Sequence, residues 1–463
     1  MPYNRQTHGA GFTWLALLVV TIVPAGLRAQ AQRSTALDAL LARADSANPS
    51  LQAVRSRVAA ARARVGPAGA WPDPMLMFGI QNLPLGTESA ASVSGHGSSA
   101  SPSLDDPMTM RMIGLGQTVP YPGKLSLRRE EARHEVEAAL ARVDASRLAI
   151  ARDVRSAFFE LAYIDRALEI TERNRTVLAD VIQITEAHLS VGTGNQADVL
   201  KARVEAARLG ETASALLEDR RATWAQLNAI LNRDDTASLP SAVIPDRIAS
   251  AAVAANPNRV RFATQTLGAR AADSPFPPLG TLEDLAIRQN PLLRESRARI
   301  AAQTARVTVA EKDYKPDIDV SLQYGQRNQR PDMITAQIAI PLPIHKHARQ
   351  DEQVAEARAE LAAMEADHRA LIDSVRARVV RLVSDLERQR TQLALYTKAI
   401  LPQGSAAATA ALSSYQSGKA DLLSALDNQS TLFAYETAYY RSLSDFAKSL
   451  AELEQTVGSE IIQ

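Results

Sequence analysis

The chain has 463 residues and a formal net charge of only +1, with 52 Lys and Arg against 51 Asp and Glu. A nucleic-acid-binding domain would show a strong basic excess, so this balance argues against a nucleic-acid partner. The chain contains no cysteine. This absence excludes disulfides, thiolate metal sites, a cysteine nucleophile and lipidation of an N-terminal cysteine.

Residues 1–31 have the three regions of an export signal. Arg5 gives a basic start, Trp14 to Ala25 is a short apolar core, and Ala29-Gln30-Ala31 is an A-x-A-like cleavage site. The apolar core is shorter than the roughly 20 residues that a membrane-spanning helix needs. We predict a cleaved signal peptide and a mature protein that begins near Gln30 or Gln32. If this protein sits in a membrane, it must cross through strands.

The rest of the chain follows one plan twice, over residues 32–232 and 281–463, separated by a linker at 233–280 that is rich in Ala, Pro and Asn. Each unit opens with an Asn-Pro pair and an Ala- and Arg-rich helix. The pairs are Asn48-Pro49 and Asn290-Pro291, and the helices are expected over about 36–70 and 281–313. Each continues to two strand-like runs and ends in a long helical stretch. A doubled plan of this kind indicates a repeat architecture and not a globular enzyme.

The strands are expected at about 75–83 and 108–119 in the first unit and about 317–325 and 332–340 in the second. Met108, Met110 and Met112 alternate with other residues at the period-2 spacing of a two-faced sheet. In a barrel wall, such alternation would turn the methionines toward lipid. The alternative is a soft-metal site, together with His345 and His347, because thioethers and imidazoles bind such metals. We predict no metal site.

Long helices are expected over 124–232 and 346–457. No proline occurs from Leu125 to Val191, and apolar residues recur every three or four positions, which predicts a supercoiled helix. At about 1.5 Å per residue this stretch would extend roughly 100 Å, too long for a compact domain. Gly192 and Gly418 each break a long helical stretch into a hairpin. Pro402 predicts a kink.

Three aromatic residues flank the predicted strands. Trp71 precedes the first strand, Tyr121 follows the second and Tyr314 precedes the third. In an up-down strand order all three lie at one edge of the sheet, as in the aromatic belt of a membrane interface. The alternative is chance, since aromatics are common in strands.

The two helix breaks carry a family resemblance. They lie in Leu189-Ser-Val-Gly192-Thr-Gly-Asn-Gln-Ala-Asp198 and Tyr415-Gln-Ser-Gly418-Lys-Ala-Asp-Leu-Leu-Ser-Ala-Leu-Asp427. With the doubled plan, these segments resemble the TolC family of outer-membrane efflux proteins over essentially the whole mature chain. The segment from Asp73 to Pro84 is similar to that of the CusC and CzcC metal-efflux types.

The resemblance implies a mainly α fold with a small β part, assembled as a homotrimer. Each subunit would give four strands to a shared twelve-stranded barrel in the outer-membrane lipid and long helices to a periplasmic tunnel. The implied partners are a periplasmic adaptor and an inner-membrane pump of the RND or ABC type. Catalytic motifs are absent from the sequence, so we predict no enzyme activity and no cofactor. A type I protein secretion channel and a pore-less periplasmic coiled-coil scaffold remain alternatives.

The resemblance also implies gate residues. Asp427 takes the place of an inward-facing acid near the closed end of the tunnel, and three copies would form a cation-attracting ring. Ser424 replaces a second acid of some members. Asp198 matches an acid that ties neighbouring helices together through an arginine; that position is Ala420 here, and Lys419 beside it is the substitute.

For Asp198 and Asp421 the alternative is a helix N-cap. The break residues are expected to dock an adaptor, because glycine lets a partner backbone approach closely. The alternative is a plain helix–helix turn. The residues of the two breaks are Val191, Gly192, Thr193, Ser417 and Gly418.

Overall fold

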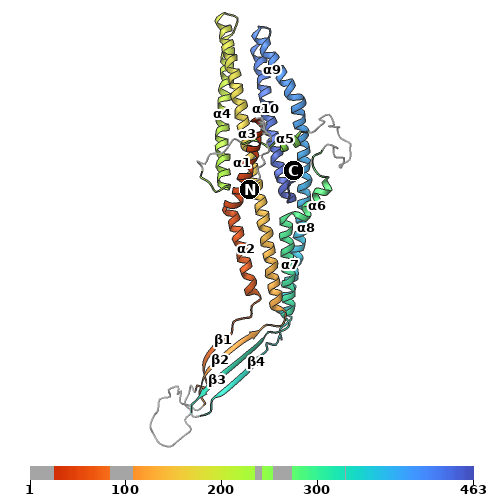
Figure 1. The fold of residues 1–463 in the computed structure, drawn as a ribbon. Helices are drawn as coiled ribbons and strands as arrows, with labels where there is room; N and C mark the ends of the chain where they lie inside the picture. The colour runs from red at the N-terminus through yellow and green to blue at the C-terminus, as the bar shows by residue number, and fades with distance from the viewer. Residues whose placement is uncertain (1–24, 84–107, 235–241, 254–273, 329, 463) are drawn as a thin grey trace, which may run out of the picture.

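The computed structural model describes residues 25–83, 108–234, 242–253, 274–328 and 330–462. The chain is elongated, with a four-stranded sheet at one end and two helical hairpins at the other (Figure 1). Residues 1–24 of the predicted signal peptide 1–31, and residues 84–107 between the first two predicted strands, lie outside the described residues.

The first unit contains α1 (Ala25–Ala47), α2 (Pro49–Ala68), β1 (Met75–Gln81), β2 (Met110–Val119), α3 (Lys124–Ser190) and α4 (Gln196–Ile230). The second contains α6 (Leu279–Gln289), α7 (Pro291–Lys312), β3 (Ile318–Arg327), β4 (Met333–Ala339), α8 (Gln350–Leu395), α9 (Leu401–Gln416) and α10 (Leu422–Val457). A short helix, α5 (Asp246–Ala252), lies between the units. The observed strands differ from the predicted ranges by at most two residues at each end.

The four strands form one antiparallel sheet in the order β1-β2-β3-β4. Cross-strand register gathers large apolar side chains on one face, where they are exposed: Leu76, Phe78, Ile113, Leu115, Val320, Leu322, Tyr324, Ile334 and Ile338. The other face carries mostly glycine, serine, threonine, glutamine and methionine. The sheet therefore has two chemically different faces.

Met110 and Met112 lie on the second of these faces. Met112 pairs with Gly79 and Gly325, whereas its neighbour Ile113 pairs with Phe78 on the apolar face. The prediction that these methionines take the apolar face is therefore wrong. Alternation along β2 shows that the strand has two faces, but only pairing with β1 and β3 decides which face is apolar.

Both Asn-Pro pairs divide a predicted continuous helix into two. We expected helices over about 36–70 and 281–313, but α1 ends before Asn48 and α6 ends before Asn290. Proline has no N–H to continue a helix and favours its first position. Each asparagine caps the following helix: the Asn48 side chain accepts from the Leu51 backbone N–H at 3.1 Å, and Asn290 accepts from Leu292 at 2.9 Å.

The same asparagines tie the two ends of each unit together. The amide of Asn48 donates to the Ile230 carbonyl at the end of α4, and that of Asn290 donates to Thr456 at the end of α10, both at 2.8 Å. Asn48 and Asn290 are buried. The internal repeat is thus a repeat of contacts as well as of element order.

The main hydrophobic core lies at mid-length, where α3, α8 and α10 meet the short helices. Phe158, Phe159 and Phe446 are among its largest fully buried side chains. The predicted linker contributes Ile248 of α5 and Phe276, which packs on Phe446 with ring centroids 6.3 Å apart. Segments 235–241 and 254–273 lie outside the described residues, but the described part of the linker is core structure.

The kink predicted at Pro402 is a change of helix type. A π-helical turn, Tyr396–Ile400, separates α8 from α9, whose second residue is Pro402. A π-helical turn changes the backbone hydrogen-bond pattern from i→i−4 to i→i−5, and here it lies immediately before the turn that contains Pro402, which has no N–H. Across the described segments, we find no helix that combines the length and the apolar character needed to cross a membrane.

Candidate functional site

Two turns form the end of the molecule opposite the sheet (Figure 1). We call the α3–α4 turn, residues 191–195, the first tip and the α9–α10 turn, residues 417–421, the second tip. Gly192 and Gly418 have φ values of +74° and +68°, a left-handed conformation that glycine adopts without strain. Thr193 N–H donates to the His188 carbonyl and Lys419 N–H donates to Ser414 in the same way. The two tips therefore have the same backbone geometry.

The hairpins touch each other just behind the tips. The Tyr415 hydroxyl of α9 lies 3.0 Å from Thr185 Oγ1 of α3, and the Tyr415 ring lies 5.6 Å from that of His188. Tyr415 and Thr185 are buried, in a small cluster with Leu178, Val181 and Leu422. Thr185 interrupts the apolar ladder of α3 in the sequence, and that interruption was the only signal of this contact.

The structure distinguishes the acids beside the tips. Asn195 caps α4, accepting from Ala197 N–H at 3.0 Å, so Asp198 is a first-turn residue and not the N-cap. Asp421 does cap α10 and accepts from Ser424 N–H at 3.3 Å. The side chains of Asp198 and Lys419 make no hydrogen bond or ion pair with other described residues. The described contacts of one chain therefore contain no lock between them.

Asp427 and Ser424 lie on an exposed side of α10. Within the described segments, no hydrogen bond or ion pair involves the Asp427 carboxylate. Its counterpart at the same step of α4 is Lys201, and that of Ser424 is Asp198. The two hairpins thus have the same backbone geometry at the tips but carry different charges at equivalent positions.

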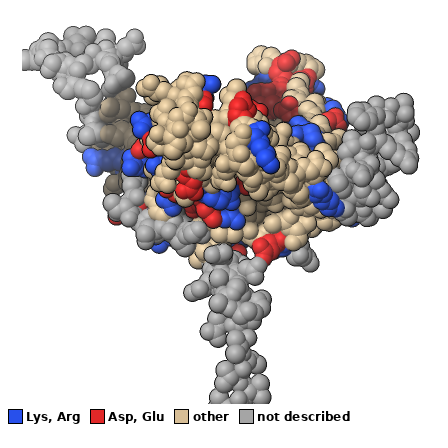
Figure 2. Space-filling model, turned by 90° about the horizontal axis from the view of Figure 1, so that it is seen from above, with Lys and Arg blue, Asp and Glu red and all other residues tan. Residues whose placement is uncertain are grey.

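Seen from the tip end, basic and acidic side chains are interspersed on the described surface (Figure 2). Exposed apolar residues also lie at or near the tips: Val191, Leu200 and Leu423, which are 71%, 54% and 57% exposed. Apolar residues left in water in this way are suited to contact with another protein.

The three predicted interface aromatics lie where the sheet meets the helices. Trp71 is exposed. The Tyr121 hydroxyl accepts from Lys315 Nζ at 3.1 Å, and this bond and the nearby charge lower the pKa of Tyr121. The Tyr314 hydroxyl donates to Asp351, which raises the pKa of Tyr314. All three residues lie at the end of the sheet that adjoins the helices.

A buried lysine joins the strands to the helices at this junction. Lys124 Nζ, at the start of α3, lies 3.0 Å from Asp313 and 2.9 Å from Asp317. Asp317 also accepts from the Tyr121 backbone N–H at 2.8 Å. Burial opposes ionisation of Asp317, but these bonds and the lysine charge outweigh it and lower the pKa of the carboxyl.

Sequence comparison assigns the family. The chain matches the family described as "Outer membrane efflux protein" over residues 40–233 and 282–459, which cover most of both units. The chain belongs to the outer membrane efflux protein family. Nodulation protein T of Rhizobium leguminosarum bv. trifolii is 24% identical over 341 residues, 71% of this chain and 67% of that protein.

Solved structures of channels share the fold of this efflux protein. The outer-membrane channel OprN superposes with a TM-score of 0.72 and 17% identity, covering 92% of this chain and 90% of that one. CusC superposes with a TM-score of 0.71 and 16% identity over 92% of each chain. The predicted fold class and family are confirmed. The similar scores do not separate the metal-efflux branch from the rest.

Proposed function

We propose that this efflux protein is the outer-membrane exit duct of a tripartite export system. Three copies close a barrel and a periplasmic tunnel, and an inner-membrane pump of the RND or ABC type supplies the energy. The duct is passive, with no catalytic step, and a cleaved signal peptide directs its export.

The observation that carries this proposal is the two-faced sheet with open edges. β1 and β4 each pair on one side only among the described strands. Unpaired strand edges are not tolerated in lipid, so a sheet of four strands must join other copies to become a closed wall. Its exposed apolar face suits lipid and its glycine- and polar-rich face suits a water-filled lumen.

The helical part supports the same arrangement. The α3 helix of 67 residues extends roughly 100 Å, α4 runs back along it as its hairpin partner, and α10 packs beside it. Leu200, Val204 and Leu217 of α4 are each more than half exposed. We infer that they pack against the helices of the next copy, because one chain leaves that side of α4 uncovered.

The two tips are the proposed contact with a periplasmic adaptor. Val191 and Leu423 offer apolar surface, and Gly192 and Gly418 allow close approach of a partner backbone. Three copies of Asp427, one from each subunit around a threefold axis, would place a ring of carboxylates at the narrow end of the tunnel. Both roles rest on the proposed trimer.

The test is the purified full-length protein in mild detergent and in planar bilayers. We expect a trimeric mass by light scattering and stepwise single-channel conductance. A monomer in detergent, or a product found only in the soluble periplasmic fraction, would instead support the pore-less scaffold. Co-purification with the products of neighbouring pump genes would identify the pump class and would separate an efflux duct from a type I secretion channel.

A further inference from the structure

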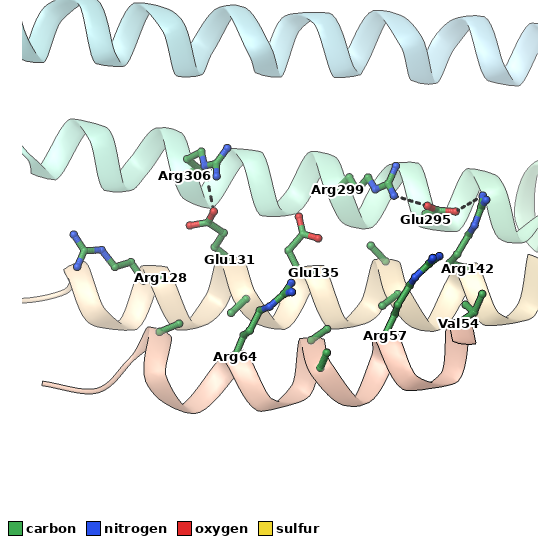
Figure 3. Close-up of a pocket in the computed structure, with 16 residues that line it drawn as sticks. Val54, Arg57, Arg64, Arg128, Glu131, Glu135, Arg142, Glu295, Arg299 and Arg306 are labelled. Carbon is green, nitrogen blue, oxygen red and sulfur yellow. Dashed lines mark ion pairs between the residues drawn. The ribbon is translucent and has the colours of Figure 1, made fainter. Parts of the chain in front are cut away.

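A large arginine-lined cavity lies between α2, α3 and α7, below the core and above the sheet. Its volume is about 1080 Å³, at the upper end of the range for small-molecule sites. Six arginines and three glutamates line it, an excess of three positive charges (Figure 3). They are Arg57, Arg64, Arg128, Arg142, Arg299, Arg306, Glu131, Glu135 and Glu295.

The arginines are placed by helical repeat. Arg57 and Arg64 are seven residues apart on α2, and Arg299 and Arg306 are seven apart on α7, so each pair lies on one face of its helix. Alanines occupy most of the remaining wall: Ala60, Ala61, Ala68, Ala132, Ala138 and Ala139. Side chains this small leave the seam between the helices open.

Three of the six guanidinium groups are held by carboxylates. Glu295, which is only 5% exposed, lies 2.7 Å from Arg299 and 3.6 Å from Arg142. Arg306 lies 3.2 Å from Glu131. These ion pairs fix the direction of three arginines along the α3–α7 side of the cavity.

The other three arginines have no ion-pair partner among the described residues. Arg57 and Arg64 leave α2 toward α3, which carries Glu135 on the side that Arg64 faces, and Arg128 stands at the end of the cavity where α3 begins (Figure 3). Like charges gathered in one concave space repel each other, and an anion placed between them relieves that repulsion. Arginine forks bind phosphate and carboxylate groups through paired hydrogen bonds.

We propose that this cavity binds a phosphorylated ligand with two or more anionic groups, held by Arg57, Arg64 and Arg128. The volume admits a ligand larger than a single phosphate, and the spread of the three arginines over two helices requires more than one anionic group. The source is either a diffusible phosphorylated molecule or the headgroup of a phosphorylated lipid. The proposal rests on the cavity and not on conduction, so it stands or falls separately from the proposed channel.

The test uses the full-length protein in its assembled form and isothermal titration calorimetry. Inositol hexakisphosphate is the soluble probe, and nanodiscs with and without cardiolipin, whose headgroup carries two phosphates, are the lipid probe. The variant is Arg57→Gln, Arg64→Gln and Arg128→Gln combined. The control removes the same charge from the same and neighbouring helices outside the cavity: Arg62→Gln, Arg133→Gln and Arg297→Gln combined.

We expect the wild type and the control to bind, with affinity that falls as salt rises. The cavity variant should lose at least about a hundredfold in affinity, since each lost charged hydrogen-bond pair is worth about tenfold or more. Binding of the soluble probe alone identifies a diffusible ligand, and binding of cardiolipin alone identifies a lipid headgroup. Absence of binding to both probes, as when acidic residues of a second copy fill the cavity, would overturn the proposal. Equal loss in variant and control would overturn it as well.

Discussion

The amide of Asn290 can be tested separately from its role as a helix cap. Asn290→Asp keeps the oxygen that accepts from Leu292 N–H, and aspartate is as good an N-cap as asparagine. The substitution removes the N–H that donates to the Thr456 carbonyl at 2.8 Å. It also places a carboxylate oxygen beside that carbonyl.

The expected cost follows from burial. Asn290 is only 4% exposed, so loss of the bond leaves the Thr456 carbonyl without a replacement partner. An unsatisfied buried acceptor costs about 1–3 kcal/mol. Asn290→Ala additionally loses the cap, worth about 1 kcal/mol more. Both variants should therefore be less stable than wild type, and Asn290→Asp has the further cost of a buried carboxylate beside a carbonyl.

The assay is unfolding of the helical far-UV circular dichroism signal in detergent. The matched control is Asn195→Asp, because Asn195 caps α4 at 3.0 Å but is exposed and its amide has no described partner. We expect the control to unfold like wild type and Asn290→Asp to unfold roughly 2–5 °C lower. If Asn290→Asp were as stable as Asn195→Asp, the amide bond to Thr456 would not be what joins the two ends of the unit.

Three further outcomes are expected. Leu322→Lys should prevent stable membrane insertion, because a lysine that faces lipid costs about 2–4 kcal/mol at mid-membrane. Gln323→Lys, on the other face of the sheet, should still insert. Equal insertion of both variants, as judged by membrane fractionation, would refute the assignment of the two faces. Asp427→Ala should weaken block of conductance by divalent and trivalent cations without loss of assembly, and unchanged block would remove Asp427 from the constriction. The folded state lowers the pKa of Asp317, so the contribution of this carboxylate to stability is present above its unfolded pKa and is lost as the pH falls through its folded pKa. Asp317→Asn should therefore flatten the loss of stability at acid pH, measured by unfolding at a series of pH values. An unaltered profile would contradict this role of Asp317.

The features that sequence predicted are those set by local chemistry. Glycine tolerates positive φ, so Gly192 and Gly418 locate the two tips without knowledge of the fold. The lack of a backbone donor in proline also ends a helix before each Asn-Pro pair, a local signal that the predicted continuous helices overlooked. The period-2 pattern of Met108, Met110 and Met112 located the second strand in the same local way. A repeat seen twice in one chain makes each such signal more specific.

The features that sequence did not predict depend on partners far along the chain. The acceptors of the two cap amides, Ile230 and Thr456, lie 182 and 166 residues away from them. The face taken by Met110 and Met112 depends on pairing with β1 and β3. The arginine cavity gathers side chains from three helices. Each of these features needs tertiary structure before it can be recognised.

The two units have the same backbone contacts but carry different polar and charged side chains at equivalent positions. Asn228 in α4 and Glu454 in α10 occupy the same step of their helices, and both are buried. Burial raises the pKa of Glu454, while Arg155 at 2.9 Å opposes that rise; the amide of Asn228 has no hydrogen-bond partner among the described residues. Glu454 therefore has its partner, on α3, within one chain. Asn228 is also covered completely within one chain, so a residue of a next copy cannot reach its amide, and the burial of that amide without a described partner is a cost that Glu454 avoids. The same helical step thus holds an ion pair in the second unit and an amide without a described partner in the first.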